Sequence, residues 1–304
     1  MKNIVRLSSL TCLLGAHILG PSASRAQPAP PPDHPSVTVK GQTYTPRSVL
    51  ARNMGTEADR ITAFPPHQII GNIYYVGTNT LSSFLIITPQ GHILIDSTYE
   101  RNVQTIEKSV TQLGFRFSDI KILLGNHAHS DHQEGDALVK QMTGAQIMAM
   151  AEDVPALQAM KPGGKEHPID RILHDGEQVM LGGTTLVAHL TPGHTPGCTT
   201  WTTTAQEGGK IYNVMFGCSL RPPAVLTPAL VDQFNRAFET VRALPCDVQL
   251  GDHGAQYNML EKYAKLKDGG PNPFIDPMSC TLEADVEQAM FNAILTEQQQ
   301  AARP

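Results

Sequence analysis

Long apolar runs and basic clusters are two features that this 304-residue chain lacks after its first 26 positions. No later segment offers the roughly 20 consecutive apolar residues that a membrane-spanning helix needs. Acidic residues outnumber basic ones by 28 to 23, and a chain of net charge -5 without a basic run is a poor ligand for nucleic acids or anionic membranes. After residue 40 the chain also lacks a linker and an internal repeat, so we expect one large domain. No feature of the sequence is typical of an obligate protein partner.

The first 26 residues have the pattern of a secretory signal peptide. Lys2 and Arg6 precede an apolar stretch over residues 7–19, and a small-x-small sequence ends at Ala26. We expect cleavage after Ala26 and export, with the periplasm as the destination. A lipoprotein acylated at Cys12 is the disfavoured alternative, because the apolar stretch continues past that residue.

Three segments follow from this organisation. Residues 1–26 are the signal peptide, and residues 41–304 form the single domain. Residues 27–40 are a proline-rich segment that should be extended, and its first part, residues 27–36, should be poorly ordered.

The first half of that domain alternates strands and helices. Val103, Ile106 and Val110 have helical spacing, and Gly114 ends the pattern. The expected strands cover residues 72–76, 83–88, 92–96, 120–124 and 146–150, and the expected helices cover residues 103–113 and 135–142.

The second half repeats the alternation. Its expected strands cover residues 178–181, 184–190, 199–203, 210–215 and 247–250, and its helices cover residues 230–243 and a stretch from residue 282. Two strand-rich halves that each end in a helix predict an α/β protein with two sheets face to face and helices outside.

Four cysteines remain after removal of the signal peptide, and three pairings are possible. If the hairpin between strands 199–203 and 210–215 is centred on Gly208, Cys198 lies opposite Cys218, within disulfide reach. This register favours Cys198–Cys218 and leaves Cys246 with Cys280. Buried free thiols are the alternative.

Residues 127–132, His-Ala-His-Ser-Asp-His, place four metal ligands in six positions directly after an apolar strand. On extended backbone, residues two apart project to one side, so His127, His129 and Asp131 can converge, and His132 completes the group. Imidazole and carboxylate are ligands that zinc accepts. A solvated polar loop is the alternative interpretation.

Two more histidines, His194 and His253, lie in glycine-containing loops after predicted strands. Taken alone, each is an ordinary loop residue. Together with the first group they give six ligands, enough for two zinc ions with an open position between them, as in a catalytic site.

These motifs resemble the metallo-β-lactamase superfamily over residues 69–280. The segments 191–198 and 243–248, and the histidine beside Asp131, are most similar to subclass B3 enzymes. The resemblance implies a four-layer αββα sandwich with two zinc ions. It assigns the first zinc to His127, His129 and His194, and the second to Asp131, His132 and His253.

The resemblance also implies a function, the opening of the amide of a small-molecule β-lactam by a hydroxide that both zinc ions share. It assigns catalysis to Asp131 and to the ligands of the first zinc. Ser219 and Arg221 are the candidates for binding the substrate carboxylate, although a solvated surface position is the alternative for Arg221. Asp96 matches the strand-end aspartate that orients a ligand histidine, and a helix-start residue is its alternative. His189, on a strand before His194, is interpreted as a core or supporting residue.

Two departures from the family pattern matter. Many superfamily hydrolases have a metal-bridging aspartate near the position of Cys218, and this chain has none between His194 and Asp232. That absence disfavours the nearest rivals, zinc hydrolases of lactones or thioesters. Gly254 stands where relatives often have proline. A non-catalytic protein braced by zinc is the remaining alternative.

Overall fold

The computed structural model describes residues 33–303, so the predicted signal peptide lies outside the described residues. Among the described helices, none has the length and apolar character required to cross a membrane. The first strand, β1 (Val37–Val39), lies within the segment that we expected to be extended, and it pairs with β2 (Gln42–Tyr44).

The first large sheet has seven strands in sequence order. Its first four strands are antiparallel, whereas β6 to β9 run parallel to one another. The strands are β3 (His67–Ile70), β4 (Ile73–Tyr75), β5 (Phe84–Thr88), β6 (Gly91–Ile95), β7 (Ile120–Leu124), β8 (Gln146–Met150) and β9 (Arg171–Leu173).

The second large sheet has five strands, also in sequence order. Its first four strands are antiparallel, and the last two are parallel. The strands are β10 (Gln178–Leu181), β11 (Thr184–Leu190), β12 (Thr199–Glu207), β13 (Lys210–Gly217) and β14 (Val248–Gly251).

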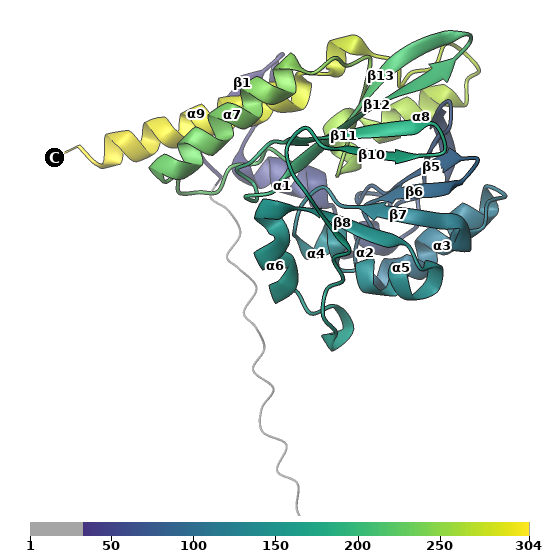
Figure 1. Ribbon diagram of the computed structural model, residues 1–304. Helices are drawn as coiled ribbons and strands as arrows, with labels where there is room; N and C mark the ends of the chain where they lie inside the picture. Colours follow the sequence, from purple (N-terminus) through teal and green to yellow (C-terminus); the bar gives the residue numbers. More distant parts are fainter. Residues whose placement is uncertain (1–32, 304) are drawn as a thin grey trace, which may run out of the picture. The chain divides into compact units, whose positions relative to one another are not determined.

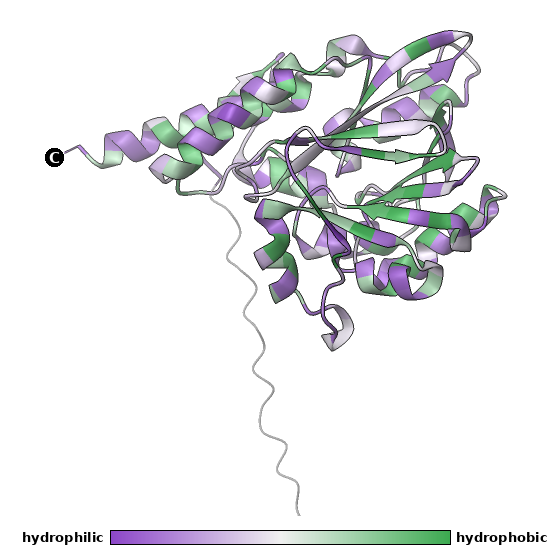
Figure 2. Ribbon diagram, viewed as in Figure 1, coloured by the Kyte–Doolittle hydropathy of each residue, from purple (hydrophilic) through white to green (hydrophobic). Residues whose placement is uncertain are grey.

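The two sheets pack face to face around one apolar core. Ile86 and Ile95 from the first sheet share this core with Leu186, Trp201 and Phe216 from the second. The strands of the first sheet are largely hydrophobic, whereas the helices alternate hydrophobic and hydrophilic residues (Figure 2). Strands buried on both faces read as continuous apolar runs, which explains the sequence pattern of β6 and β7.

Helices cover the outer face of each sheet (Figure 1). Helices α3 (Val103–Gln112) and α5 (Asp136–Thr143) pack on the first sheet in a cluster that includes Leu94 and Leu123. Helices α7 (Pro228–Ala243) and α9 (Leu282–Ala301) share a cluster with Met215 of β13. The result is the four-layer αββα sandwich that the sequence predicts.

Short elements were not predicted from the sequence. They are the strands β1, β2, β3 and β9 and the helices α1 (Pro46–Met54), α2 (Glu57–Ile61), α4 (Ser130–Gln133), α6 (Val154–Ala159) and α8 (Met259–Leu266). The predicted longer elements are present, with ends that differ by a few residues. For example, the hairpin strands β12 and β13 extend beyond 199–203 and 210–215.

The hairpin register differs by one residue from the expectation. Glu207 pairs with Lys210, so the turn is the dipeptide Gly208-Gly209 rather than a turn centred on Gly208. Both glycines have positive φ, which L side chains rarely adopt. Despite the shift, the structure joins Cys198 to Cys218 (Cα–Cα 5.9 Å) and Cys246 to Cys280 (Cα–Cα 6.1 Å).

Candidate metal centre

The predicted ligands lie where strands of both sheets end. Strands β6 and β7 are parallel, as are β13 and β14, and β11 has the same direction as β13. The segments after the carboxyl ends of these strands therefore meet at one edge of the sandwich, the usual place for a site in sheets of this kind.

The first triad consists of His127 and His129, after β7, and His194, between β11 and β12. One ligand atom from each lies within 4.8 Å of the others. The rings of His129 and His194 are 4.8 Å apart, and each lies 4.7 Å from the ring of His127. Gly193 permits this arrangement, because it has a φ of 138° and a Cβ there would approach the Phe234 ring to 2.9 Å.

The second triad consists of Asp131 and His132, in the one-turn helix α4, and His253, after β14. Asp131 Oδ2 lies 3.5 Å from Nε2 of His132 and 3.9 Å from Nε2 of His253. The rings of His127 and His132 are 4.2 Å apart, so the two triads are adjacent.

Two buried aspartates hold histidines of these triads. Asp96 Oδ2 lies 3.0 Å from Nδ1 of His132, and its other oxygen accepts the backbone N–H of Asn126. Asp96 also has a φ of 61°, which is uncommon for a residue with a side chain and often marks a functional site. The strand-end aspartate therefore contacts the ligand segment as expected, and it does not start a regular helix.

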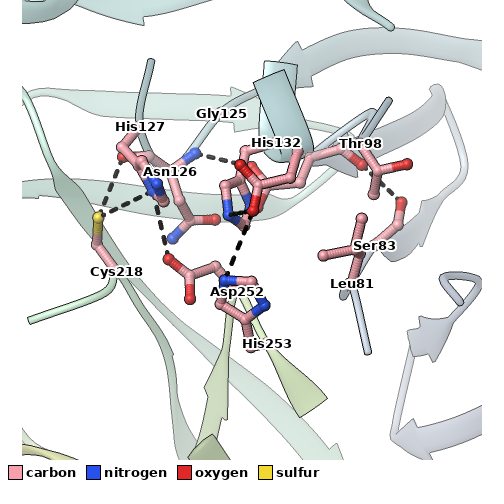
Figure 3. Close-up of polar contacts among 12 residues, drawn as sticks. Leu81, Ser83, Thr98, Gly125, Asn126, His127, His132, Cys218, Asp252 and His253 are labelled. Atoms are coloured by element: carbon pink, nitrogen blue, oxygen red, sulfur yellow. Dashed lines mark hydrogen bonds and ion pairs between the residues drawn. The ribbon is translucent and has the colours of Figure 1, made fainter. Parts of the chain in front are cut away.

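Asp252 is the second of these aspartates, and we did not predict it. Its Oδ2 lies 3.3 Å from Nδ1 of His127 and accepts the backbone N–H of Ser219. Figure 3 shows His127 in contact with both Asp252 and Cys218. An acidic residue directly before a predicted ligand at a strand end was the available sequence signal.

The histidines differ in their proton affinity. Burial and the neighbouring His132 lower the pKa of His127 to about 3. Burial acts in the same direction on His132, but Asp131 and Asp96 outweigh it and raise the pKa of His132 to about 10. The carboxylates around His132 thus stabilise positive charge at the position where a metal cation would bind.

Unsatisfied nitrogens show that the residues fit metal ions. His127 Nε2 and His132 Nε2 are buried and have no hydrogen-bond partner in the structure. Buried polar atoms are nearly always satisfied, and unsatisfied ones call for a missing ion or water. Nδ1 of His127 and of His132 faces a carboxylate, which is how ligand histidines are oriented for zinc.

A cavity opens beside the triads and is lined by His129, Asp131, His194 and His253. Ser219 and Arg221 line it together with Leu50 and Met54 of α1. The Ser219 hydroxyl donates to Asp252 Oδ1, so it is already engaged. His189 lies apart from the triads, half-buried, with Nε2 2.8 Å from Thr202 Oγ1.

Taken together, an αββα sandwich with two adjacent His/Asp triads at one edge defines a metal-binding protein of the hydrolase type. Cys198 and Cys218 also approach His127, but they are paired with each other in the structure.

The comparisons identify the family within this class. Residues 76–206 match the model of the metallo-beta-lactamase superfamily. The native FEZ-1 metallo-beta-lactamase from Legionella gormanii is 40% identical, with a TM-score of 0.73 over 79% of this chain and 97% of that one. BJP-1, a subclass B3 metallo-beta-lactamase of Bradyrhizobium japonicum, is 37% identical, with a TM-score of 0.74 over 81% and 98%. This chain belongs to the metallo-β-lactamase superfamily, and its structure strongly matches those of subclass B3 enzymes.

The curated relatives are more distant. A probable metallo-hydrolase of Burkholderia pseudomallei (strain 1710b) is 31% identical over 146 residues, which are 42% of this chain and 49% of the relative. A hydroxyacylglutathione hydrolase of Hyphomonas neptunium is 34% identical over 101 residues, which are 33% of this chain and 36% of the relative. The chain thus spans half or less of the length of these relatives.

Proposed function

We propose that this protein is a zinc-dependent β-lactamase with two metal ions per chain. The observation that carries the proposal is the pair of adjacent triads with unsatisfied buried nitrogens, in a chain 37–40% identical to solved metallo-β-lactamases over nearly their whole length. His127, His129 and His194 would hold one zinc, and Asp131, His132 and His253 the other. When bound, zinc supplies a Lewis acid that acidifies water and polarises a carbonyl.

Asp131 is the chain's own candidate for handling a proton. Burial raises its pKa, but the charge of nearby histidines, His132 above all, outweighs burial and holds the pKa well below its usual range. The carboxylate therefore stays ionised at neutral pH and can accept a hydrogen bond from water in the cavity. Such a contact orients the water toward a substrate carbonyl.

Arg221 is the candidate for binding the substrate carboxylate. It lines the cavity beside the triads and forms no ion pair with any residue between 33 and 303. A guanidinium without a carboxylate partner can bind one from a ligand with two parallel hydrogen bonds. Ser219 lies beside Arg221 in the cavity, and its hydroxyl donates a hydrogen bond to Asp252.

A lactone or thioester hydrolase is the second candidate. The partial likeness to a hydroxyacylglutathione hydrolase favours it. The sequence between His194 and Asp232 argues against it, because no aspartate there can bridge two metals.

The test is zinc content combined with turnover. The purified protein should bind two zinc ions and hydrolyse at least one of a penicillin, a cephalosporin and a carbapenem, and a chelator should abolish the reaction. Hydrolysis of a homoserine lactone or a thioester without β-lactam turnover would favour the second candidate. Two bound zinc ions without any turnover would favour a non-catalytic role.

We further propose export to the periplasm, on the basis of the sequence of residues 1–26. Mass spectrometry of the protein expressed from its full chain in a Gram-negative host should find an N-terminus at residue 27 in the periplasmic fraction. An uncleaved cytoplasmic product would contradict export.

A further inference from the structure

Asp153 lies behind the first triad, and neither the sequence pattern nor the family likeness pointed to it. It ends the short helical turn after β8 and is 2% exposed. Its carboxylate accepts three hydrogen bonds from two different segments. Oδ2 accepts from the Ala128 N–H and the Thr195 hydroxyl, both at 2.8 Å, and Oδ1 accepts from the Gly197 N–H at 2.7 Å.

The donors flank the ligands of the first triad. Ala128 stands between His127 and His129, and Thr195 directly follows His194. These two segments are 65 or more residues apart in the sequence, and they follow strands of different sheets, β7 and β11. The carboxylate of Asp153 therefore bridges the two loops that must hold three imidazoles around one ion.

Gly197 leaves room for the Asp153 carboxylate. A Cβ on Gly197 would lie 2.6–2.7 Å from atoms of Asp153, so glycine permits the close approach. A buried carboxylate that accepts several hydrogen bonds is rigid, because each lost bond would leave an unsatisfied buried group. Asp153 differs from Asp96 and Asp252, which contact ligand side chains directly.

We propose that Asp153 is a positioning residue for the first metal site, which sets the separation of His129 and His194 by tying the Ala128 and Thr195 segments together. This inference rests on the metal centre of the proposed function. It does not depend on which substrate the centre hydrolyses.

Asp153→Ala in the purified protein tests the proposal. Competition with a chromophoric zinc chelator should show one of the two zinc affinities lowered by about 10- to 100-fold, the usual effect of removing a partner that supports metal ligands. Asp153→Asn should have a smaller effect. It retains one oxygen acceptor but turns an amide N–H toward a backbone N–H.

Double variants in which only one triad is complete show which of the two sites loses zinc affinity. In His253→Ala, which leaves the first triad intact, adding Asp153→Ala should weaken the remaining zinc. In His194→Ala, which leaves the second triad intact, the same addition should change zinc affinity little. An equal loss in both backgrounds, or no loss in the first, would overturn the proposal.

Asp247→Ala is the matched control for stability. Asp247 accepts hydrogen bonds from the backbone N–H and side-chain amide of Asn213, away from the triads. The Asp247→Ala variant should have a lower melting temperature than the wild type and the same zinc affinity. A loss of zinc affinity in Asp247→Ala equal to that in Asp153→Ala would overturn the proposal.

If Asp153→Ala does not fold, Thr195→Val provides a second test, because it removes one of the three donors and should weaken binding of the first zinc alone. Zinc binding without β-lactam turnover would contradict the proposed substrate but not this inference.

Discussion

Four aspartates near the metal centre have different environments. Asp131 faces the cavity, whereas Asp96, Asp153 and Asp252 are each 2% exposed or less. The buried three accept hydrogen bonds that orient imidazoles or join loops. Aspartate thus serves in two roles here. The more exposed Asp131 is a candidate metal ligand, and the buried aspartates hold the candidate ligands in place.

The second triad can be tested at a single residue. His253→Ala should reduce bound zinc from two ions to one. It should lower β-lactam turnover by more than about 100-fold, because losing a ligand costs more than losing its supporting partner. Elemental analysis and steady-state kinetics measure both.

His189→Ala is the control for that variant. His189 is a half-buried histidine outside both triads, and its removal should leave zinc content and turnover unchanged. Two zinc ions in His253→Ala would contradict the assignment.

At this scale the six proposed ligands could be predicted, because four of them lie within six consecutive positions and the other two stand in glycine-containing loops. Asp153 could not be predicted. It lies between a strand and a helix, and its partners are 25 to 44 residues away.

Among the elements, α7 supports the loop that carries His194. Phe234 of α7 packs against Gly193, and a Cβ at Gly193 would lie 2.9 Å from the ring. Gly193→Ala should lower the free energy of unfolding by about 1–3 kcal/mol through overpacking, in addition to its backbone strain. It should also weaken zinc binding. Urea denaturation and zinc competition measure these effects.

Gly208→Ala is the matched control. Gly208 also has positive φ, but no atom lies within 4 Å of a Cβ there, so only the backbone strain applies. Equal losses of stability in the two variants would contradict a packing role for Phe234.

A pair of cysteines connects the start of β14 with the start of α9. Cys246 and Cys280 are 34 residues apart in sequence. If they form a disulfide, replacing both with serine should cost about 2–4 kcal/mol of unfolding free energy, since the cross-link restricts the unfolded chain. Chemical denaturation measures the cost. Detection of free thiols at both positions in the unreduced, unfolded protein would contradict the disulfide.

Long strands were predictable because apolar runs and turn residues mark them. One-turn helix α4 and the short strand β9 carry too few residues for a periodic pattern. The hairpin register was one residue off, because composition alone does not decide whether the turn is centred on Gly208 or formed by Gly208 and Gly209 together.

On the scale of the whole molecule, an ion pair joins α9 to α1. Arg52 Nη2 lies 2.7 Å from Oε2 of Glu283, and Glu287, one turn further along α9, is fully buried. Burial, followed by the charge of Glu283, raises the pKa of Glu287 well above its usual range, while Arg52 and Arg221 oppose this shift.

This arrangement predicts a pH dependence of stability. Because the folded state raises the pKa of Glu287, folding favours its protonated form, and stability falls as pH rises from the ordinary pKa of 4.5 toward the raised value. Glu287→Gln, which cannot ionise, should therefore gain stability relative to the wild type as the pH rises through this window.

Thermal denaturation across that pH range measures the difference. Glu297→Gln is the control, because Glu297 lies on the same helix but is exposed. A constant difference between Glu287→Gln and the wild type at all pH values would contradict the predicted shift.

The sequence by itself determined the αββα layering and the six proposed ligands, because apolar periodicity and short motifs are local properties of the chain. The tertiary structure decided which loops meet, and it placed Asp252 against His127 and Asp153 between the loops of Ala128 and Thr195. The physical reason is that these hydrogen bonds join residues from different strands and sheets. Their partners are set by register and packing, and these leave no pattern in the neighbouring sequence.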